Sequence, residues 1–185
     1  MSEIISRIFE AFQKRGNDKY GDEVVTQLQH AIQCADLAKD ANQSPQLIVA
    51  ALLHDLGHIL PDSDLPENCQ TNLDDKHEEV GHQFLMQYFG PSIADPVRMH
   101  VAAKRYLCTK DAKYEQILSP TSLKSYYDQG GPMSPEEMAD FESEPHFEQA
   151  LKLRGWDDTA KSADIPMSEL EDFRGLLQDC LLNQS

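Results

Sequence analysis

Apolar residues recur at helical spacing along most of the chain. Between Glu23 and Ala41 they return every three or four positions, which places them on one face of a helix. The residues of this face are Val24, Leu28, Ala31, Ala35 and Ala38. Ser44 and Pro45 form a typical N-cap and first turn, and they open a second helix that Gly57 is well placed to end. Because the second helix is apolar nearly all round, we expect it in the middle of the domain.

The rest of the chain follows the same period. Proline, aspartate and asparagine residues between 58 and 73 are typical of a loop. Further helices are predicted over about 74–90, from 91 past 104, in short pieces after 120, over about 145–161 and over about 168–182. No segment alternates apolar and polar residues over the length of a strand, so the sequence predicts an all-α fold without a sheet.

Charge, apolar runs and cysteine spacing disfavour several classes of protein. The chain has 185 residues, with 16 lysines and arginines against 32 acidic residues, so its formal net charge is −16. Such a field repels polyanions, and a nucleic-acid-binding role is therefore disfavoured. No apolar run approaches the roughly 18 residues of a membrane span, and the N-terminus lacks the pattern of a signal peptide. The cysteines show no CxxC spacing, which favours free thiols in a cytoplasmic protein; they are Cys34, Cys69, Cys108 and Cys180.

The histidines suggest a metal centre. His54 and Asp55 stand at the end of the most apolar helix, where two ionisable groups cost several kcal/mol unless they are paired or bind a metal. His30 lies on the preceding helix, His77 follows the loop, and His100 lies on the next helix. Neighbouring helices of a bundle can direct such side chains to one point. Four histidines with carboxylates suit a pair of first-row metal ions, one aspartate bridging them.

Other polar residues near this series are less decisive. Lys104 lies one helical turn after His100, although the residues alone allow an ordinary surface lysine equally well. Glu23 lies about two turns before His30, and Tyr20 alone is best read as an aromatic residue at a helix start. His82 and His146 belong to no such series, and we interpret them as surface residues or as residues behind the ligands.

The series of histidines with Asp55 resembles the HD-domain superfamily, whose pattern is H…HD…D with two further histidines in its two-metal members. The last ligand must then come from residues 156–161. In the similar inositol-oxygenase motif the ligand stands four residues before a lysine, as Asp157 does before Lys161; Asp158 is the alternative. Most members of the superfamily are phosphohydrolases, and a minority use two irons and dioxygen.

Further segments narrow the resemblance to the PhnZ-type mixed-valent diiron oxygenases, which cleave the carbon–phosphorus bond of 2-amino-1-hydroxyethylphosphonate to give glycine and phosphate. The similar segments lie within residues 18–161 and include His100–Leu107, Tyr127–Gly131 and Leu153–Asp158. The resemblance implies an HD-domain helical bundle: a single domain over 1–185, with a metal-binding core at about 20–161 and a C-terminal helix at about 168–183. It also implies two iron ions, O2 as co-substrate, a small organophosphonate substrate and no membrane or nucleic-acid partner. We expect a monomer.

The resemblance also implies a role for each residue. One iron would be bound by His30, His54, Asp55 and Asp157, and Asp55 would bridge to a second iron that His77 and His100 complete. Tyr20 would occupy an open position on the second iron at rest, and Glu23 would pair with the substrate ammonium. The phosphonate would be held by Lys104 and His58, helped by Ser122 and Ser125. Because the protein is strongly acidic, a positive residue such as Lys104 is needed locally.

Three alternatives remain open at this point. The same chemistry on the trimethylammonio analogue would give glycine betaine. Its quaternary group would need aromatic faces, which Tyr20, Tyr126 or Tyr127 could supply. A metal-dependent phosphohydrolase would use the same ligands, since histidine and aspartate also hold manganese and zinc. A non-catalytic HD-like module is disfavoured by the complete set of ligands.

Overall fold

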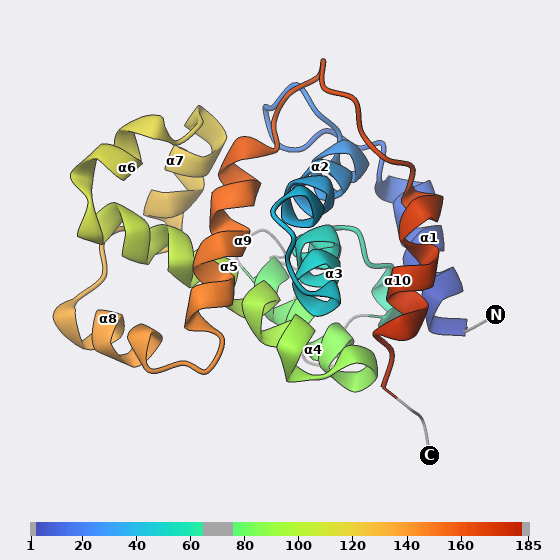
Figure 1. Ribbon diagram of the computed structural model, residues 1–185. Coiled ribbons are helices and arrows are strands. Elements are labelled where there is room, and N and C mark those ends of the chain that lie inside the picture. Colours follow the sequence, from blue (N-terminus) through green and yellow to red (C-terminus); the bar gives the residue numbers. More distant parts are fainter. Residues whose placement is uncertain (1–2, 65–75, 183–185) are drawn as a thin grey trace.

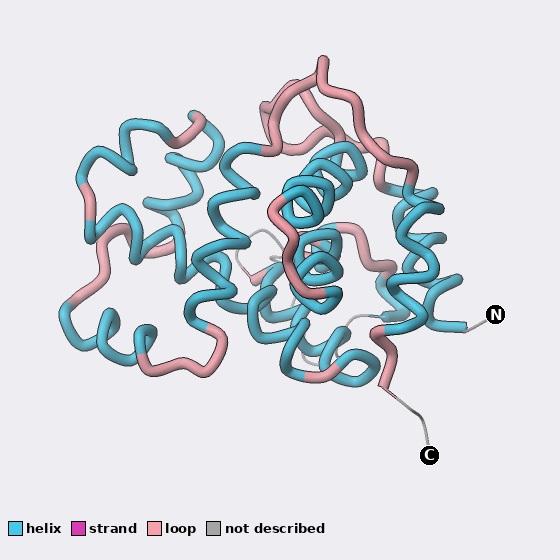
Figure 2. Tube along the Cα trace, viewed as in Figure 1, coloured by secondary structure: helices cyan, strands magenta, loops and turns pink. Residues whose placement is uncertain are grey.

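The computed structural model describes residues 3–64 and 76–182, and within them the regular structure is helical (Figures 1 and 2). The α-helices are α1 (Glu3–Arg15), α2 (Gln27–Asp40), α3 (Pro45–Leu53), α4 (His77–Phe89), α5 (Pro91–Lys110), α6 (Ala112–Ile117), α7 (Pro120–Asp128), α8 (Pro135–Glu142), α9 (Phe147–Thr159) and α10 (Arg174–Asp179). Short 3-10 helices lie at η1 (Leu56–His58), η2 (Asp62–Asp64) and η4 (Leu170–Phe173). In these ranges strand pairing is limited to one isolated bridge between Lys19 and Thr26, so the predicted all-α class is confirmed.

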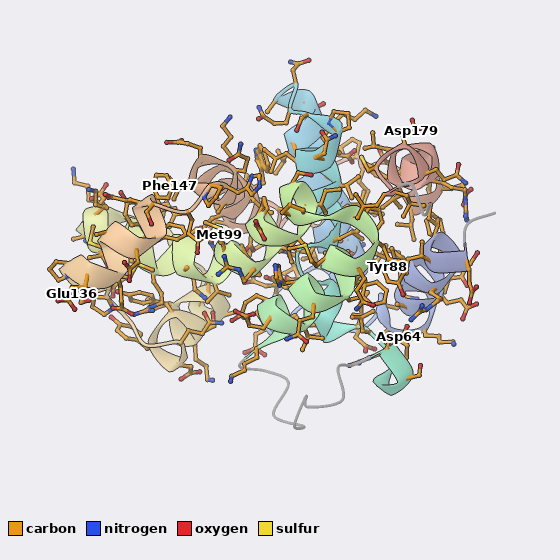
Figure 3. The ribbon with its side chains drawn as sticks, turned by 90° about the horizontal axis from the view of Figure 1, so that it is seen from below. Asp64, Tyr88, Met99, Glu136, Phe147 and Asp179 are labelled. Carbon is orange, nitrogen blue, oxygen red and sulfur yellow. The ribbon has the colours of Figure 1, made fainter. Side chains whose placement is uncertain are left out.

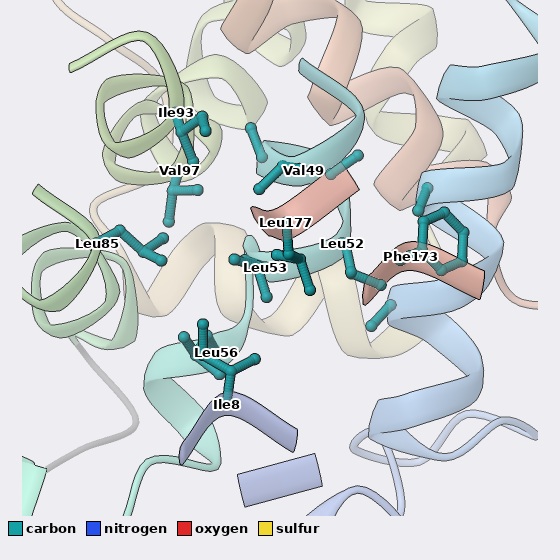
Figure 4. Packing of buried hydrophobic residues seen from close by; sticks show 14 of the residues in the cluster. Ile8, Val49, Leu52, Leu53, Leu56, Leu85, Ile93, Val97, Phe173 and Leu177 are labelled. Atoms are coloured by element: carbon teal, nitrogen blue, oxygen red, sulfur yellow. The ribbon is translucent and has the colours of Figure 1, made fainter. Parts of the chain in front are cut away.

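Helix α3 lies in the middle of the bundle, as its apolar sequence predicts. Its residues from Leu47 to Leu53 are all buried, and Figure 4 shows Val49, Leu52 and Leu53 facing side chains from α4, α5 and the C-terminal helices. Ser44 caps α3 by accepting a hydrogen bond from the Leu47 backbone N–H, with Pro45 in the first turn. The centre of the bundle is therefore an apolar helix that is followed directly by the polar residues His54 and Asp55.

Several predicted boundaries are wrong by a few residues. Helix α2 begins at Gln27 because Thr26 and Gln29 form a capping box, and Val24, predicted on its apolar face, is 71% exposed before the helix starts. Helix α3 ends at Leu53, before Gly57. The C-terminal helix predicted over about 168–183 is shorter, with η4 followed by α10, which ends at Asp179; residue 183 lies outside the described residues.

Helix α1 contributes to the main apolar core and lies outside the metal-binding core predicted at about 20–161. Ile5 and Ile8 are completely buried and belong to the same apolar cluster as Leu53 of α3 and Leu177 of α10 (Figure 4). In Figure 1, α1 and α10 lie together on one side of the central helices. The amphipathic N-terminus thus closes the bundle.

A second layer lies on the opposite side. Helices α6, α7 and α8 lie beyond α5 and α9 in Figure 1. A smaller apolar cluster joins α5, α8 and α9 there, with Met99 and Phe141 buried and Phe147 packed against them; Figure 3 labels Met99 and Phe147 in this part of the molecule. This layer forms one wall of the site described below.

A close backbone approach fixes the start of α4. A Cβ atom at Gly57 would lie only 2.0 Å from the carbonyl oxygen of His77, so only glycine lets η1 pack directly on the first turn of α4. At the other end of α4, Gly90 adopts a φ of 76° and turns the chain into α5. These two glycines hold the beginning and the end of α4 in place.

Cys34, Cys108 and Cys180 are free thiols, whereas Cys69 and Asp74, near which α4 was predicted to begin, lie outside the described residues. None of the helices in residues 3–64 and 76–182 combines the length and apolar character that crossing a membrane requires.

Candidate metal centre

Five helices direct polar side chains to one buried point. His30 comes from α2, His54 and Asp55 follow the end of α3, His77 opens α4, His100 lies in α5, and Asp157 lies in α9. Each of these residues is at most 6% exposed. The helical pattern predicted one histidine on each of four helices, and the structure brings all four together with both aspartates.

The first group of facing atoms combines His30, His54 and Asp157. The Nε2 atoms of His30 and His54 are 3.1 Å apart. The Oδ1 atom of Asp157 lies 3.3 Å from His30 Nε2, and the Oδ2 atom of Asp55 lies 3.1 Å from His54 Nε2. Two imidazole nitrogens and two carboxylate oxygens therefore meet at one place.

The second group lies on the other side of Asp55. The Nε2 atoms of His77 and His100 are 3.2 Å apart, and they lie 3.3 and 3.6 Å from Asp55 Oδ1. Asp55 thus presents Oδ2 to the first group and Oδ1 to the second. A carboxylate placed between two such groups has the position of a bridging ligand.

The hydrogen bonds of the rings show which nitrogens carry protons. The Nδ1 atoms donate to backbone carbonyls: His30 to Ala160 at 2.8 Å, His54 to Ala51 at 2.8 Å and His100 to Val97 at 2.6 Å. A carbonyl oxygen only accepts, so the hydrogen of each neutral ring resides on Nδ1 and the lone pair on Nε2.

With the ring protons on Nδ1, the atoms that face one another in the centre are mostly hydrogen-bond acceptors, namely Nε2 lone pairs and carboxylate oxygens. In neutral rings the Nε2 lone pairs of His30 and His54 point at each other across 3.1 Å with no proton between them. Within the described part of the chain, Asp55 Oδ2 is buried and receives no hydrogen bond. Converging lone pairs of nitrogen and oxygen are what a divalent first-row cation binds. The residues present therefore fit a pair of metal ions.

The pKa shifts of His54, Asp55 and Asp157 also indicate that the buried cluster favours a bound positive charge. Burial opposes the charged form of His54, yet Asp55 and Asp157 outweigh burial and raise its pKa to about 9. Burial also works against ionised Asp55 and Asp157, but His54 holds the pKa of Asp55, and Arg154 that of Asp157, well below the usual range. Both aspartates are therefore ionised at neutral pH, and the centre attracts a cation, whether a proton or a metal ion.

The structure distinguishes Asp157 from Asp158. Asp157 turns toward His30, while its other oxygen accepts a hydrogen bond from Arg154 at 2.6 Å. Asp158 instead pairs with Arg154 and accepts a hydrogen bond from Tyr114. Sequence reasoning assigned Arg154 no role, although its i, i+3 and i, i+4 spacing to the two aspartates is the local signal of such a pair.

Tyr20 and His58 lie against the histidines. The Tyr20 ring stacks on His30 with the ring centres 3.9 Å apart, and its hydroxyl donates to Asp157 Oδ1 at 3.3 Å. The contacts of Tyr20 are thus with the first group; its position on a second metal stays a prediction. His58 stacks on His77, also with the ring centres 3.9 Å apart, and burial lowers its pKa to about 3, so it is a neutral ring.

Cationic and hydroxyl groups lie beside the centre. Lys104 is 3% exposed, and its ammonium donates to Ser125 Oγ at 2.6 Å. Lys161 donates to Ser122 Oγ at 2.7 Å, and Arg154 reaches the same hydroxyl at 3.4 Å. Although the whole chain is acidic, cationic and hydroxyl groups thus gather locally beside the centre. Lys161 was noted in the sequence only for its spacing, because its partners are distant in the chain.

Glu23 lies at the same end of the site. Its Oε1 atom is buried without a hydrogen-bond donor among the described residues, and the Lys161 ammonium lies 3.6 Å from it. The carboxylate is thus partly neutralised yet still able to accept a hydrogen bond.

A cavity of about 1230 Å³ lies beside the centre. Its lining includes Tyr20, Asp55, His58, His100, Lys104 and Ser122. The cavity exceeds the volume of a small phosphonate, so recognition there depends on the charged groups more than on size.

His82 and His146 lie apart from the centre. Both face Asp95, with ring nitrogens 3.1 and 3.8 Å from its carboxylate oxygens.

Known proteins share this sequence along most of its length. The HD domain profile matches residues 28–136, more than half of the chain. The chain is 42% identical over 179 residues to the hydroxymethylphosphonate dioxygenase of Gimesia maris, covering 97% of this chain and 89% of the relative. It is 39% identical over 175 residues to the 1-hydroxy-2-(trimethylamino)ethylphosphonate dioxygenase (glycine-betaine-forming) of Leisingera caerulea, covering 95% of this chain and 89% of that relative. The predicted resemblance is thereby confirmed.

Proposed function

The chain belongs to the HD-domain family, and within it we propose a diiron oxygenase that uses O2 to cleave the carbon–phosphorus bond of 2-amino-1-hydroxyethylphosphonate. The products are glycine and phosphate, which together contain all atoms of the phosphonate and of one O2. The observation that carries this proposal is the convergence of four histidine Nε2 atoms and carboxylate oxygens beside a cation-lined cavity. The relatives named as phosphonate dioxygenases favour oxygenase chemistry over hydrolysis.

The proposed ligands form two groups joined by Asp55. His30, His54 and Asp157 would hold one iron, and His77 and His100 the other. When bound as a mixed-valent Fe(II)/Fe(III) pair, the irons would supply the redox chemistry with dioxygen. The protein supplies the positions and compensates the charge.

The cavity residues orient the substrate in this proposal. Lys104 donates to a phosphonate oxygen, with Ser125 and Ser122 completing the anion site and His58 as a neutral partner. Glu23 is not among the residues that line the cavity; in this proposal it accepts hydrogen bonds from the substrate ammonium through Oε1, which has no hydrogen-bond donor among the described residues and lies 3.6 Å from the Lys161 ammonium. With its two charged ends held in this way, the substrate would present carbon 1 and its hydroxyl to the side where His77, His100 and Asp55 would hold a metal ion. We propose a monomeric cytoplasmic enzyme, and the free thiols of Cys34, Cys108 and Cys180 are compatible with that compartment.

Hydroxymethylphosphonate is the second candidate substrate. It has no cation, and the Lys161 ammonium 3.6 Å from Glu23 would then neutralise the carboxylate permanently. The relative from Gimesia maris carries that substrate in its name. The trimethylammonio analogue has weaker structural support, because of the three tyrosines considered for its quaternary group only Tyr20 lines the cavity. Tyr126 is buried in another cluster and Tyr127 is directed to Glu115.

The test compares the three phosphonates on iron-loaded protein. Oxygen uptake, phosphate release and the carbon product are measured together. We expect one O2 consumed per phosphate, with glycine formed and the highest kcat/KM on the amino compound. Phosphate release without oxygen uptake would establish the phosphohydrolase instead, and faster turnover of hydroxymethylphosphonate would establish the second candidate.

The variant Glu23→Gln separates the two substrates further. A hydrogen bond to a charged group contributes about 1.5–3 kcal/mol, so E23Q is expected to lower kcat/KM for the amino compound about 10–100-fold. Turnover of hydroxymethylphosphonate should change little. Equal losses on both compounds would contradict the assigned role of Glu23.

A further inference from the structure

His77 differs from the other three histidines in the partner of its Nδ1 atom. His30, His54 and His100 donate Nδ1–H to backbone carbonyls. His77 Nδ1 instead faces the carboxylate of Glu78, with Oε2 at 3.5 Å. Within the described residues both atoms are buried and neither has a hydrogen-bond partner. Two unpartnered polar atoms thus face each other directly behind the ring.

Glu78 is held in a half-buried position by the first turn of α4. Its side chain is 13% exposed and lies at the edge of a separate cavity of about 400 Å³. The opposite edge of the His77 ring, Nε2, faces Asp55 at 3.3 Å and His100 at 3.2 Å. The ring therefore lies between the metal centre and a carboxylate that belongs to neither group of facing atoms.

A carboxylate behind a metal-binding histidine has two effects. It fixes the tautomer with the lone pair on the metal side, and its charge makes the ring a stronger donor to the metal than a carbonyl does. The contact of 3.5 Å must shorten by about 0.5 Å to become a good hydrogen bond. The presence of a cation at Nε2 favours that change, because it makes the Nδ1–H group more acidic.

We propose that Glu78 is a positioning residue: it accepts the Nδ1–H of His77 and thereby strengthens binding of the metal ion held by His77 and His100. The metal ion held by His30, His54 and Asp157 has no such support, so the two positions differ in affinity through one carboxylate. This inference rests on the proposed dinuclear centre.

The test measures iron binding, without turnover. Iron-loaded protein is equilibrated anaerobically with increasing amounts of a ferrous chelator, and retained iron is counted per chain. Glu78→Gln removes the charge at nearly constant shape, and Glu78→Ala removes the acceptor entirely. Glu79→Gln is the matched control, because Glu79 is the exposed neighbour on the same helix turn and loses the same charge.

We expect E78Q to bind one of the two irons about 10–100-fold more weakly than the wild type and E78A to bind it more weakly still. The other iron and the melting temperature of the iron-free protein should remain unchanged, and E79Q should behave as the wild type. Wild-type retention of both irons by E78Q and E78A would overturn the inference, as would equal loss of both irons with a lowered melting temperature. A wild-type protein that never retains two irons would instead overturn the dinuclear centre itself.

Discussion

Replacing Lys104 by methionine tests the proposed phosphonate site. The lysine is 3% exposed, lines the cavity and donates to Ser125 Oγ at 2.6 Å, so its ammonium is buried beside one hydroxyl and the open cavity. A buried hydrogen bond to a charged group is worth about 1.5–3 kcal/mol, and K104M is therefore expected to raise KM about 10–100-fold. Iron content should remain that of the wild type, because Lys104 contacts none of the proposed ligands through a hydrogen bond.

Lys124→Met is the matched control. Lys124 lines the same cavity from α7, but its side chain is 81% exposed and forms an ion pair with Asp128 at 2.8 Å. An exposed charge is screened by solvent, so K124M should change KM less than about threefold. Steady-state phosphate release over a range of phosphonate concentrations gives KM and kcat for both variants. Equal effects of K104M and K124M, or a loss of iron in K104M, would refute the assigned site.

The pH dependence of KM gives an independent readout. Burial, reinforced by the charge of Arg154, lowers the pKa of Lys104 to about 8. Above this pKa the amine is neutral and no longer attracts the phosphonate, so the wild-type KM should rise about fivefold between pH 8 and pH 9. K104M has no such group, and its KM should be flat over the same interval. A wild-type KM that is constant through pH 9 would contradict the proposed ionisation.

Three further predictions concern the centre and the fold. Gly57→Ala places a Cβ against the His77 carbonyl oxygen, so the start of α4 must move, and elemental analysis should show about one fewer iron per chain than in the wild type. An iron content equal to that of the wild type would contradict this. Asp157→Asn should lose iron under chelator challenge whereas Asp158→Asn retains it, and the reverse result would exchange their roles. Ile8→Ala should lower the free energy of unfolding in urea by about 2–5 kcal/mol, and a change below about 1 kcal/mol would show that α1 contributes little.

The cluster of histidines and aspartates could be predicted from local sequence, because the burial of such polar groups is costly unless they have partners. His54 and Asp55 follow an apolar helix that had to be central, and burial of such groups demands partners. Because one histidine lies on each of four successive helices, packing of neighbouring helices is enough to bring them together. The start of α2 could not be placed from apolar spacing alone, since Thr26 and Gln29 end the preceding segment by side-chain capping and leave Val24 outside.

The residues around the centre could not be predicted from local sequence, because they are brought together by contacts between positions far apart in the chain. Lys161 reaches Ser122 and Glu23 across 39 and 138 positions of the chain, and no local pattern indicates such pairs. Glu78 has the same residue type and local sequence as Glu79, and only the direction of α4 decides which of the two faces His77. Long-range geometry of this kind emerges only when the helices are packed.

Anaerobic purification followed by electron paramagnetic resonance tests the dinuclear centre most directly. We expect close to two irons per chain and the signal of a coupled ferrous–ferric pair, which changes when 2-amino-1-hydroxyethylphosphonate is added without oxygen. One iron or fewer per chain after reconstitution, or a signal indifferent to the phosphonate, would contradict it.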